Sequence, residues 1–233
     1  LIGTDPLLAT SYSLFIVGAS SLIGTVKKAT KGLVEYRTAV IFGIPAIISV
    51  YIARAYVLPA IPPELMSVGD LVVTDRLAIM LLFATIMIVA AYSMIRPSKT
   101  GKNEGVVVEQ EFNYPLIFLE GIAVGLLTGL VGAGGGFLII PALVLLSKLP
   151  MKMAVGTSLS IIAAKSLIGF TGDLSNFDIE WGFLIPFTAL SIVGIFVGSY
   201  ISGFISGEKL KPVFGWFVLI MGVLIIGKEL TSG

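Results

Sequence analysis

The 233-residue chain is 56% hydrophobic and 12% charged, and its 15 Lys and Arg and 14 Asp and Glu leave a formal net charge of +1. This composition excludes an ordinary soluble domain, in which roughly 25% of residues are charged, and the charge gives no indication of nucleic-acid binding. The chain has neither Cys nor His, which excludes disulfides, thiol catalysis and the commonest metal ligands. We therefore expect a multi-pass α-helical membrane protein without a metal site or a cofactor.

Apolar runs of about 20 residues, long enough for a helix to cross the hydrocarbon core, follow one another along the chain. The predicted spanning segments are 7–26, 38–58, 76–95, the glycine-rich element 115–147, 153–171, 182–205 and 212–228. The longest polar interruption, 96–114, separates a first half at 1–95 from a second half at 115–233. We expect two structural units joined by this linker.

The two halves contain matching short sequences. The matches are Thr10–Ser13 with Thr157–Ser160, Ser21–Gly24 with Ser166–Gly169, and Val34–Tyr36 with Ile179–Trp181. Three matches in the same order favour an internal repeat, which is typical of secondary transporters, over chance similarity among apolar segments. The second repeat begins with a glycine-rich element and the first begins near Leu1, so we expect the corresponding element of the first repeat to precede this sequence.

Lys and Arg in the short loops predict the orientation of the repeats. The basic segments 27–37, 96–114, 148–152 and 206–211 are predicted to be cytoplasmic, and the acidic segments 59–75 and 171–181 to be outside. Because 27–37 and 171–181 are equivalent in the two halves but lie on opposite sides, the repeats are predicted to be inverted. The element 115–147 begins and ends inside, so it is a re-entrant pair of half-helices or a helical hairpin. The expected fold is an all-α membrane bundle of two inverted repeats.

The glycine cluster G-L-V-G-A-G-G-G runs from Gly129 to Gly136 and is followed by Pro141. Each glycine weakens a helix interior by about 1 kcal/mol relative to Ala, so we predict helical pieces at 116–131 and 136–147 joined by a bend. Bare amide N–H groups at the start of the second piece attract anions. The substrate-binding candidates here are Gly132, Gly134, Gly135 and Gly136. The alternative is that the glycines only allow close helix packing.

Lys165 lies well inside the segment 153–171, where a charge costs at least about 2.5–3.5 kcal/mol. We interpret it as the positive charge that binds an anionic substrate; the alternatives are a neutral or a snorkelling lysine. Further substrate-binding candidates are the hydroxyl residues Thr157, Ser158, Ser160, Thr10 and Ser11, for which helix capping is the alternative. Glu120 is a candidate to carry a coupling proton or to pair with Lys165, although we favour a position at the cytoplasmic interface.

A longer pattern connects these residues with a known family. The chain reads G-L-x-x-G-L-x-G-x-G-G-G-x-L-x-x-P-x-L from Gly125, followed by A-x-G-T-S at Ala154–Ser158. This pattern resembles the TauE/SafE family of sulfite exporter-like permeases. The resemblance implies a secondary transporter of a small sulfur-containing anion, such as sulfite or a sulfonate, in the plasma or inner membrane.

The expected partners are a small anionic substrate and the lipid bilayer, with no nucleic acid, and a homo-oligomer stays an open alternative. Alternative functions are an anion channel, a non-transporting assembly subunit and an intramembrane enzyme. The lack of His, of Cys and of paired carboxylates within the spans speaks against an enzyme, so we assign no catalytic residue.

Overall fold

The computed structural model describes residues 6–57, 60–62, 64–68, 71–96, 113–131, 136–173 and 179–232. Its helices are α1 Pro6–Ala29, α2 Tyr36–Ile52 with the π-helical turn η1 Ala53–Val57, α4 Asp75–Ile95, α5 Tyr114–Val131, α6 Gly136–Leu145, α7 Met151–Asp173, α8 Trp181–Gly203 and α9 Gly207–Ser232. Within the described residues, six helical segments are long and apolar enough to cross a membrane: Tyr36–Val57, Leu77–Ile95, Tyr114–Val131, Met151–Thr171, Trp181–Gly203 and Gly207–Lys228. The expected all-α membrane fold is confirmed.

One element was not predicted. β1 Glu64–Val68 pairs antiparallel with β2 Leu71–Thr74, directly before α4. Both strands are rich in apolar residues, among them the β-branched Val68, Val72 and Val73, which favour strands, whereas 59–75 was expected to be a loop.

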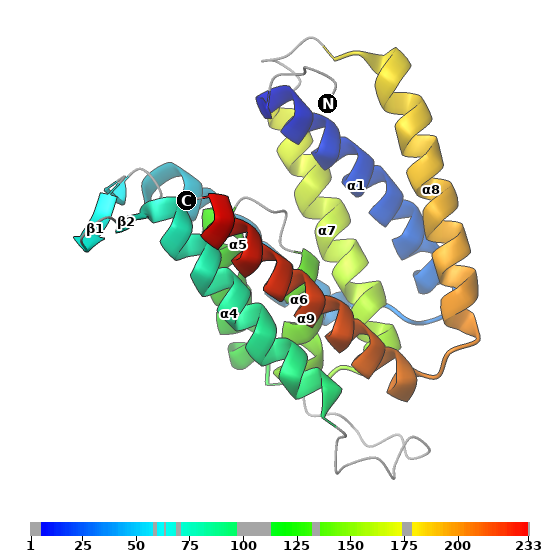
Figure 1. Cartoon of the computed structure of the whole chain (residues 1–233). Coiled ribbons are helices and arrows are strands. Elements are labelled where there is room, and N and C mark those ends of the chain that lie inside the picture. Colours follow the sequence, from blue (N-terminus) through cyan, green and yellow to red (C-terminus); the bar gives the residue numbers. More distant parts are fainter. Residues whose placement is uncertain are drawn as a thin grey trace.

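The helices form two groups that meet at α7 (Figure 1). The first group consists of α1, α7 and α8, and its small core contains Tyr12, Phe170 and Leu184. The larger core lies among α2, α4, α5, α6, α7 and α9, with Phe42, Met87 and Leu143 among its fully buried side chains. Because α7 packs against α1, α2, α6 and α9, residues on it are enclosed by helices from both halves of the chain.

Glycines on one face of α5 allow close contact with α2. A Cβ placed at Gly125 would lie 2.5 Å from the carbonyl oxygen of Ala46, and one placed at Gly129 would lie 2.7 Å from the Cβ of Ala53. Gly121 meets the Phe42 carbonyl in the same way. The spacing G-x-x-x-G-x-x-x-G therefore brings two backbones together, as in other membrane helix pairs.

Helices α1 and α7 contact each other through reciprocal pairs. A Cβ at Gly24 would lie 3.1 Å from Leu159 Cδ1, and a Cβ at Gly169 would lie 3.4 Å from Leu14 Cδ1. The residue offset that relates Ser21 to Ser166 also relates Leu14 to Leu159 and Gly24 to Gly169. The early part of each helix therefore contacts the late part of the other, so the two helices are antiparallel and their contacts are equivalent.

Two hydrogen bonds between the halves follow the same offset. Thr157 Oγ1 accepts from the Glu35 N–H at 3.0 Å, just before α2. The Tyr12 hydroxyl accepts from the Glu180 N–H at 3.0 Å, just before α8. At this offset Tyr12, rather than Thr10, corresponds to Thr157, and Glu35 corresponds to Glu180, so the predicted match of Thr10–Ser13 with Thr157–Ser160 is two residues out of this register. Each half of the chain therefore binds the start of the equivalent helix in the other half.

Candidate functional site

The side chain of Lys165 reaches from α7 to the end of α5. Its Nζ lies 3.5 Å from Thr128 Oγ1, and the Thr128 hydroxyl donates at 3.2 Å to the Gly125 carbonyl. Thr128 is only 3% exposed and lies in the last turn of α5. The final carbonyl groups of a helix carry partial negative charge, which stabilises a nearby cation. The ammonium group is thus positioned where α5 ends and the segment leading to α6 begins.

Thr128 was not among the residues predicted for the site. It occupies one of the variable positions of the glycine pattern, between Gly125 and Gly129. A polar residue in an apolar, glycine-rich segment was the available signal, but only the fold, in which the Lys165 side chain reaches from α7 to α5, identifies its partner.

The glycine bend lies only partly within the described residues. Gly136 is the first residue of α6, and Gly132, Gly134 and Gly135 lie outside the described residues. The helical pieces predicted at 116–131 and 136–147 correspond to α5 and α6. The first N–H groups of α6 have no partners within that helix and are therefore available as donors.

The hydroxyl candidates of α7 are separated from Lys165. Ser158 donates to the Val155 carbonyl at 2.9 Å, Ser160 donates to the Thr157 carbonyl at 2.8 Å, and Thr157 accepts from Glu35. At 1.5 Å per residue, Thr157 and Ser158 lie about 10–12 Å from Lys165 along the axis. A small anion cannot contact both ends of this stretch at once.

The hydroxyl candidates of the first half lie on α1. Ser11 is buried, and Thr10 belongs to the same turn, although its side chain is outside the described residues. Neighbouring Tyr12 packs in the small core with Phe170 of α7. Ser11 therefore lies near the far end of α7 from Thr157.

Glu120 is enclosed by neighbouring parts of the protein, and its predicted position at the cytoplasmic interface stays a prediction. Its side chain is 5% exposed because α6 returns along α5 and brings Ser147 next to it. Ser147 Oγ donates to Glu120 Oε2 at 2.6 Å, and Oε1 has no hydrogen-bond partner within the described part of the chain. Glu120 lies two turns before Thr128 on α5, about 12 Å along the axis, so its partner is Ser147 rather than Lys165.

A family model that matches nearly the whole chain identifies the family. The family model described as "Sulfite exporter TauE/SafE" matches residues 1–225. The chain belongs to the TauE/SafE family. Its members include several similar proteins with transporter names.

A probable membrane transporter protein of Xylella fastidiosa (strain 9a5c) is 28% identical over 98% of this TauE/SafE chain and 83% of its own length. The probable membrane transporter protein YunE of Bacillus subtilis is 24% identical over 97% of the chain and 83% of its own length. A probable membrane transporter protein of Methanocaldococcus jannaschii is 34% identical over 49% of the chain and 46% of its own length. No solved structure matches the chain. The TauE/SafE chain is a multi-pass membrane transporter.

The acidic residues of this TauE/SafE protein form no metal site in the part that the structure describes. No group of three or more Asp, Glu, His or Cys side chains gathers there. The site chemistry within the described residues is therefore that of Lys165, hydroxyl groups and backbone amides.

Proposed function

We propose that this TauE/SafE protein is a secondary transporter of a small anion in the plasma or inner membrane. A sulfur-containing anion such as sulfite or a sulfonate is the proposed substrate class, because the family description names a sulfite exporter. The position of Lys165 carries the proposal: an ammonium group in a spanning helix, 3.5 Å from a buried hydroxyl at the end of α5.

In the proposed site, Lys165 supplies the charge that attracts the anion. The effective dielectric between packed helices is lower than that of water, so the attraction is stronger there. The amides of Gly132, Gly134, Gly135 and Gly136 are the proposed donors to the anion's oxygens, and Thr128 orients the ammonium group. Ser158 is proposed to lie along the substrate path, since it is about 10 Å from Lys165 along the axis of α7, too far to share one small ligand.

We further propose that residues 1–95 and 115–233 are inverted repeats joined by the cytoplasmic linker 96–114. The reciprocal pairs Gly24–Leu159 and Leu14–Gly169 support this arrangement, because equivalent contacts in an antiparallel pair imply a two-fold axis across the helices. The bonds to Glu35 and Glu180 follow the same relationship. Inverted repeats of this kind allow a transporter to expose one site alternately to either side.

The test is anion uptake into liposomes that contain the purified protein. Sulfite, thiosulfate, a sulfonate and a carboxylate are compared, and saturable uptake of one class is expected. Lys165→Met is expected to weaken apparent affinity at least tenfold, while Lys165→Arg keeps partial activity because the charge remains but its shape changes.

Lys209→Met, which removes an exposed charge from α9, is the matched control and is expected to transport normally. Uptake that never saturates would indicate a channel. Parental affinity in Lys165→Met would show that Lys165 does not bind the substrate. Loss of uptake in Gly135→Leu, with Lys165 intact, would identify the contribution of the bend.

A further inference from the structure

Glu120 places a carboxyl group with one unpartnered oxygen inside the larger core. The side chain is 5% exposed, Ser147 Oγ donates to Oε2 at 2.6 Å, and Oε1 has no hydrogen-bond partner among the described residues. No Lys or Arg in the described part of the chain forms an ion pair with it. An ionised carboxylate buried without a counter-charge is so costly that the group neutralises instead. This geometry therefore suits a neutral carboxyl group better than a carboxylate.

The ionisable residues around this end of α5 lie at or near the surface. α6 contains none, and those at the same end of α2, of α4, of α5 and of the turn after α6 are exposed, apart from one half-buried tyrosine. They are Tyr36, Arg37, Tyr92, Arg96, Lys148 and the half-buried Tyr114. Proton binding by Glu120 is thus set by its burial and by Ser147 rather than by a charged neighbour.

Thr38 is a second buried group without a partner at the same end of the bundle. Its Oγ1 has no hydrogen-bond partner among the described residues, and the side chain is fully buried. Helices α2 and α5 run in the same direction, and Gly121 meets the Phe42 carbonyl. Thr38 lies one turn before this contact and Glu120 directly before it, so the two are about 4–5 Å apart along the axis. Two polar groups thus lie between the end predicted to be cytoplasmic and the middle of α5.

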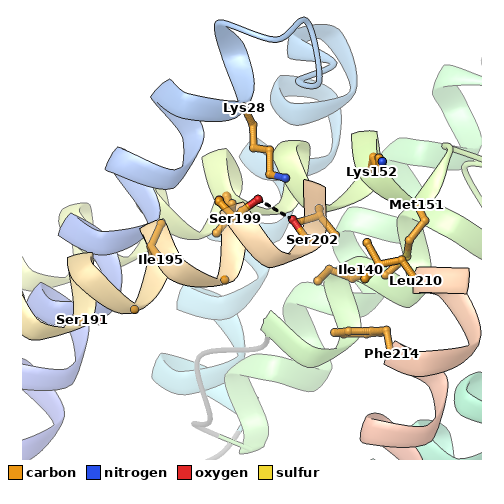
Figure 2. Close-up of a pocket in the computed structure, with 14 residues that line it drawn as sticks. Lys28, Ile140, Met151, Lys152, Ser191, Ile195, Ser199, Ser202, Leu210 and Phe214 are labelled. Atoms are coloured by element: carbon orange, nitrogen blue, oxygen red, sulfur yellow. Dashed lines mark hydrogen bonds between the residues drawn. The ribbon is translucent and has the colours of Figure 1, made fainter. Parts of the chain in front are cut away.

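The helix that covers Glu120 is short and has apolar contacts on another side. α6 has ten residues and contains Pro141. Figure 2 shows Ile140 of α6 close to Met151 of α7 and Leu210 of α9, and the three side chains line one cavity. Apolar contacts are not directional, so these side chains can slide past one another without losing a hydrogen bond. A shift of α6 that carries Ser147 away from α5 would admit water to the carboxyl group.

The charge on Glu120 affects an anion bound at Lys165. Glu120 and Thr128 are about 12 Å apart along α5, and Lys165 Nζ lies 3.5 Å from Thr128 Oγ1. At an effective dielectric of about 20, a negative charge about 12–15 Å away weakens the binding of a monovalent anion about five- to tenfold. The anion therefore binds more tightly when Glu120 holds a proton, and the bound anion strengthens proton binding by the same factor.

We propose that Glu120 binds a proton that this protein transports together with its anion. In the enclosed state the proton is on Oε1, while Ser147 donates to Oε2. When α6 shifts, the Oε1–H bond breaks and the proton passes to a water molecule, which leaves a carboxylate that weakens anion binding at Lys165. One proton and one anion are then released on the same side. The coupling rests on the proposed anion transport, whereas proton binding by Glu120 does not.

The first test needs no substrate. Infrared spectra of the parent protein in lipid nanodiscs at pH 7 are compared with those of Glu120→Gln. The parent is expected to show the band of a protonated carboxylic acid, and Glu120→Gln is expected to lose it. Glu208→Gln, which changes an exposed carboxylate at the start of α9, is the matched control and should keep the band.

The second test measures coupling in liposomes whose membrane potential is held at zero with potassium and valinomycin. Thiosulfate and methanesulfonate are the probes, because neither carries a proton near pH 7. An inward proton gradient is expected to raise uptake by the parent at least fivefold, and anion inflow without a gradient should acidify the interior. Glu120→Gln keeps an acceptor for Ser147 and should lose the response to the gradient, yet still exchange labelled anion, which needs no net proton movement. Glu208→Gln should respond as the parent does.

The proposal is overturned if the parent lacks the protonated-acid band or if Glu120→Gln retains it. It is equally overturned if the gradient raises uptake by Glu120→Gln as much as uptake by the parent, or if it has no effect on the parent. If the parent takes up neither anion, the proposed transport of such anions fails. The infrared band then decides separately whether Glu120 holds a proton.

Discussion

Ser147, two residues beyond α6, donates a 2.6 Å hydrogen bond to the buried carboxyl group of Glu120 in the second turn of α5. The bond joins the two ends of the element 115–147. It holds α5 and α6 as a hairpin whose ends lie on the same side of the bundle. Lys165 Nζ lies 3.5 Å from Thr128 Oγ1 near the other end of α5.

Replacing Ser147 by Ala is expected to destabilise the protein by about 1–3 kcal/mol, because the buried carboxyl group loses its donor. Thermal unfolding in detergent measures the effect, and Ser147→Thr should retain most of the stability. Thr85→Ala is the control, since Thr85 is exposed and donates only to the Leu81 carbonyl of its own helix. An effect of Ser147→Ala no larger than that of Thr85→Ala would contradict the role of this bond.

The reciprocal bonds at Thr157 and Tyr12 predict matching effects in the two halves. Thr157→Val and Tyr12→Phe each leave a partly buried N–H without its acceptor, so each should cost about 1–3 kcal/mol. Thr157→Ser keeps the acceptor and should be close to the parent in unfolding temperature. If only one of the two variants is destabilised, the equivalence of the repeats at these positions is refuted.

The glycine face of α5 predicts strong sensitivity to added volume. Gly125→Ala places a Cβ against the backbone of Ala46, which cannot move without shifting α2, so a loss of about 1–3 kcal/mol is expected. Gly182→Ala, whose Cβ meets no atom within 4 Å, should change the unfolding temperature little. Equal unfolding temperatures for the two variants would show that α5 and α2 are not packed this closely.

The inverted arrangement predicts that the turn after α1 and the segment 171–181 lie on opposite sides of the membrane. Because the chain has no native Cys, Thr30→Cys and Asn176→Cys provide single labelling sites. An impermeant thiol reagent added to intact cells should label only Asn176→Cys, and permeabilised cells should show both. Labelling of both variants in intact cells would exclude inverted repeats.

The lowered pKa of Lys28 predicts that this residue lowers the free energy of unfolding in neutral detergent, by an amount that depends on pH. Burial and the nearby lysines lower this pKa below its ordinary value of 10.5, so the unfolded chain binds the proton more tightly than the folded one. Lys28 therefore destabilises the folded protein less as the pH rises from its pKa in the folded protein to its pKa in the unfolded chain. Lys28→Met should be more stable than the parent at pH 7, and this advantage should shrink as pH approaches 10.5.

Unfolding temperatures across this pH range measure the difference. Lys209→Met is the control for the loss of one positive charge at the same end of the bundle. If both lysine variants show the same pH trend, burial of Lys28 is not the cause of the pH dependence.

The helices could be predicted because their signals are local. Runs of apolar residues located the spans, and the glycines of 129–136 separated α5 from α6, whereas Pro141 lies inside α6. The β1–β2 hairpin was missed because its two strands are only five and four residues long and lack the alternation of apolar and polar residues that indicates a strand.

The contacts of the candidate site could be predicted less well, because helix packing selects the partners. Lys165 was recognised from its unusual position, but its hydrogen-bond partner Thr128 lies 37 residues away in sequence. The burial of Glu120 could not be predicted from its distance to the start of the span, because it depends on α6 returning along α5 and bringing Ser147 next to the carboxyl group.

The hydrogen bond between Glu35 and Thr157 also has a consequence for synthesis of the protein. The acceptor for the first turn of α2 is made 122 residues after its donor. At about 5–20 residues per second, the ribosome needs roughly 6–24 seconds to reach it. During that interval the Thr157 hydroxyl cannot bind this N–H, so water or another polar group must satisfy it until α7 has been made.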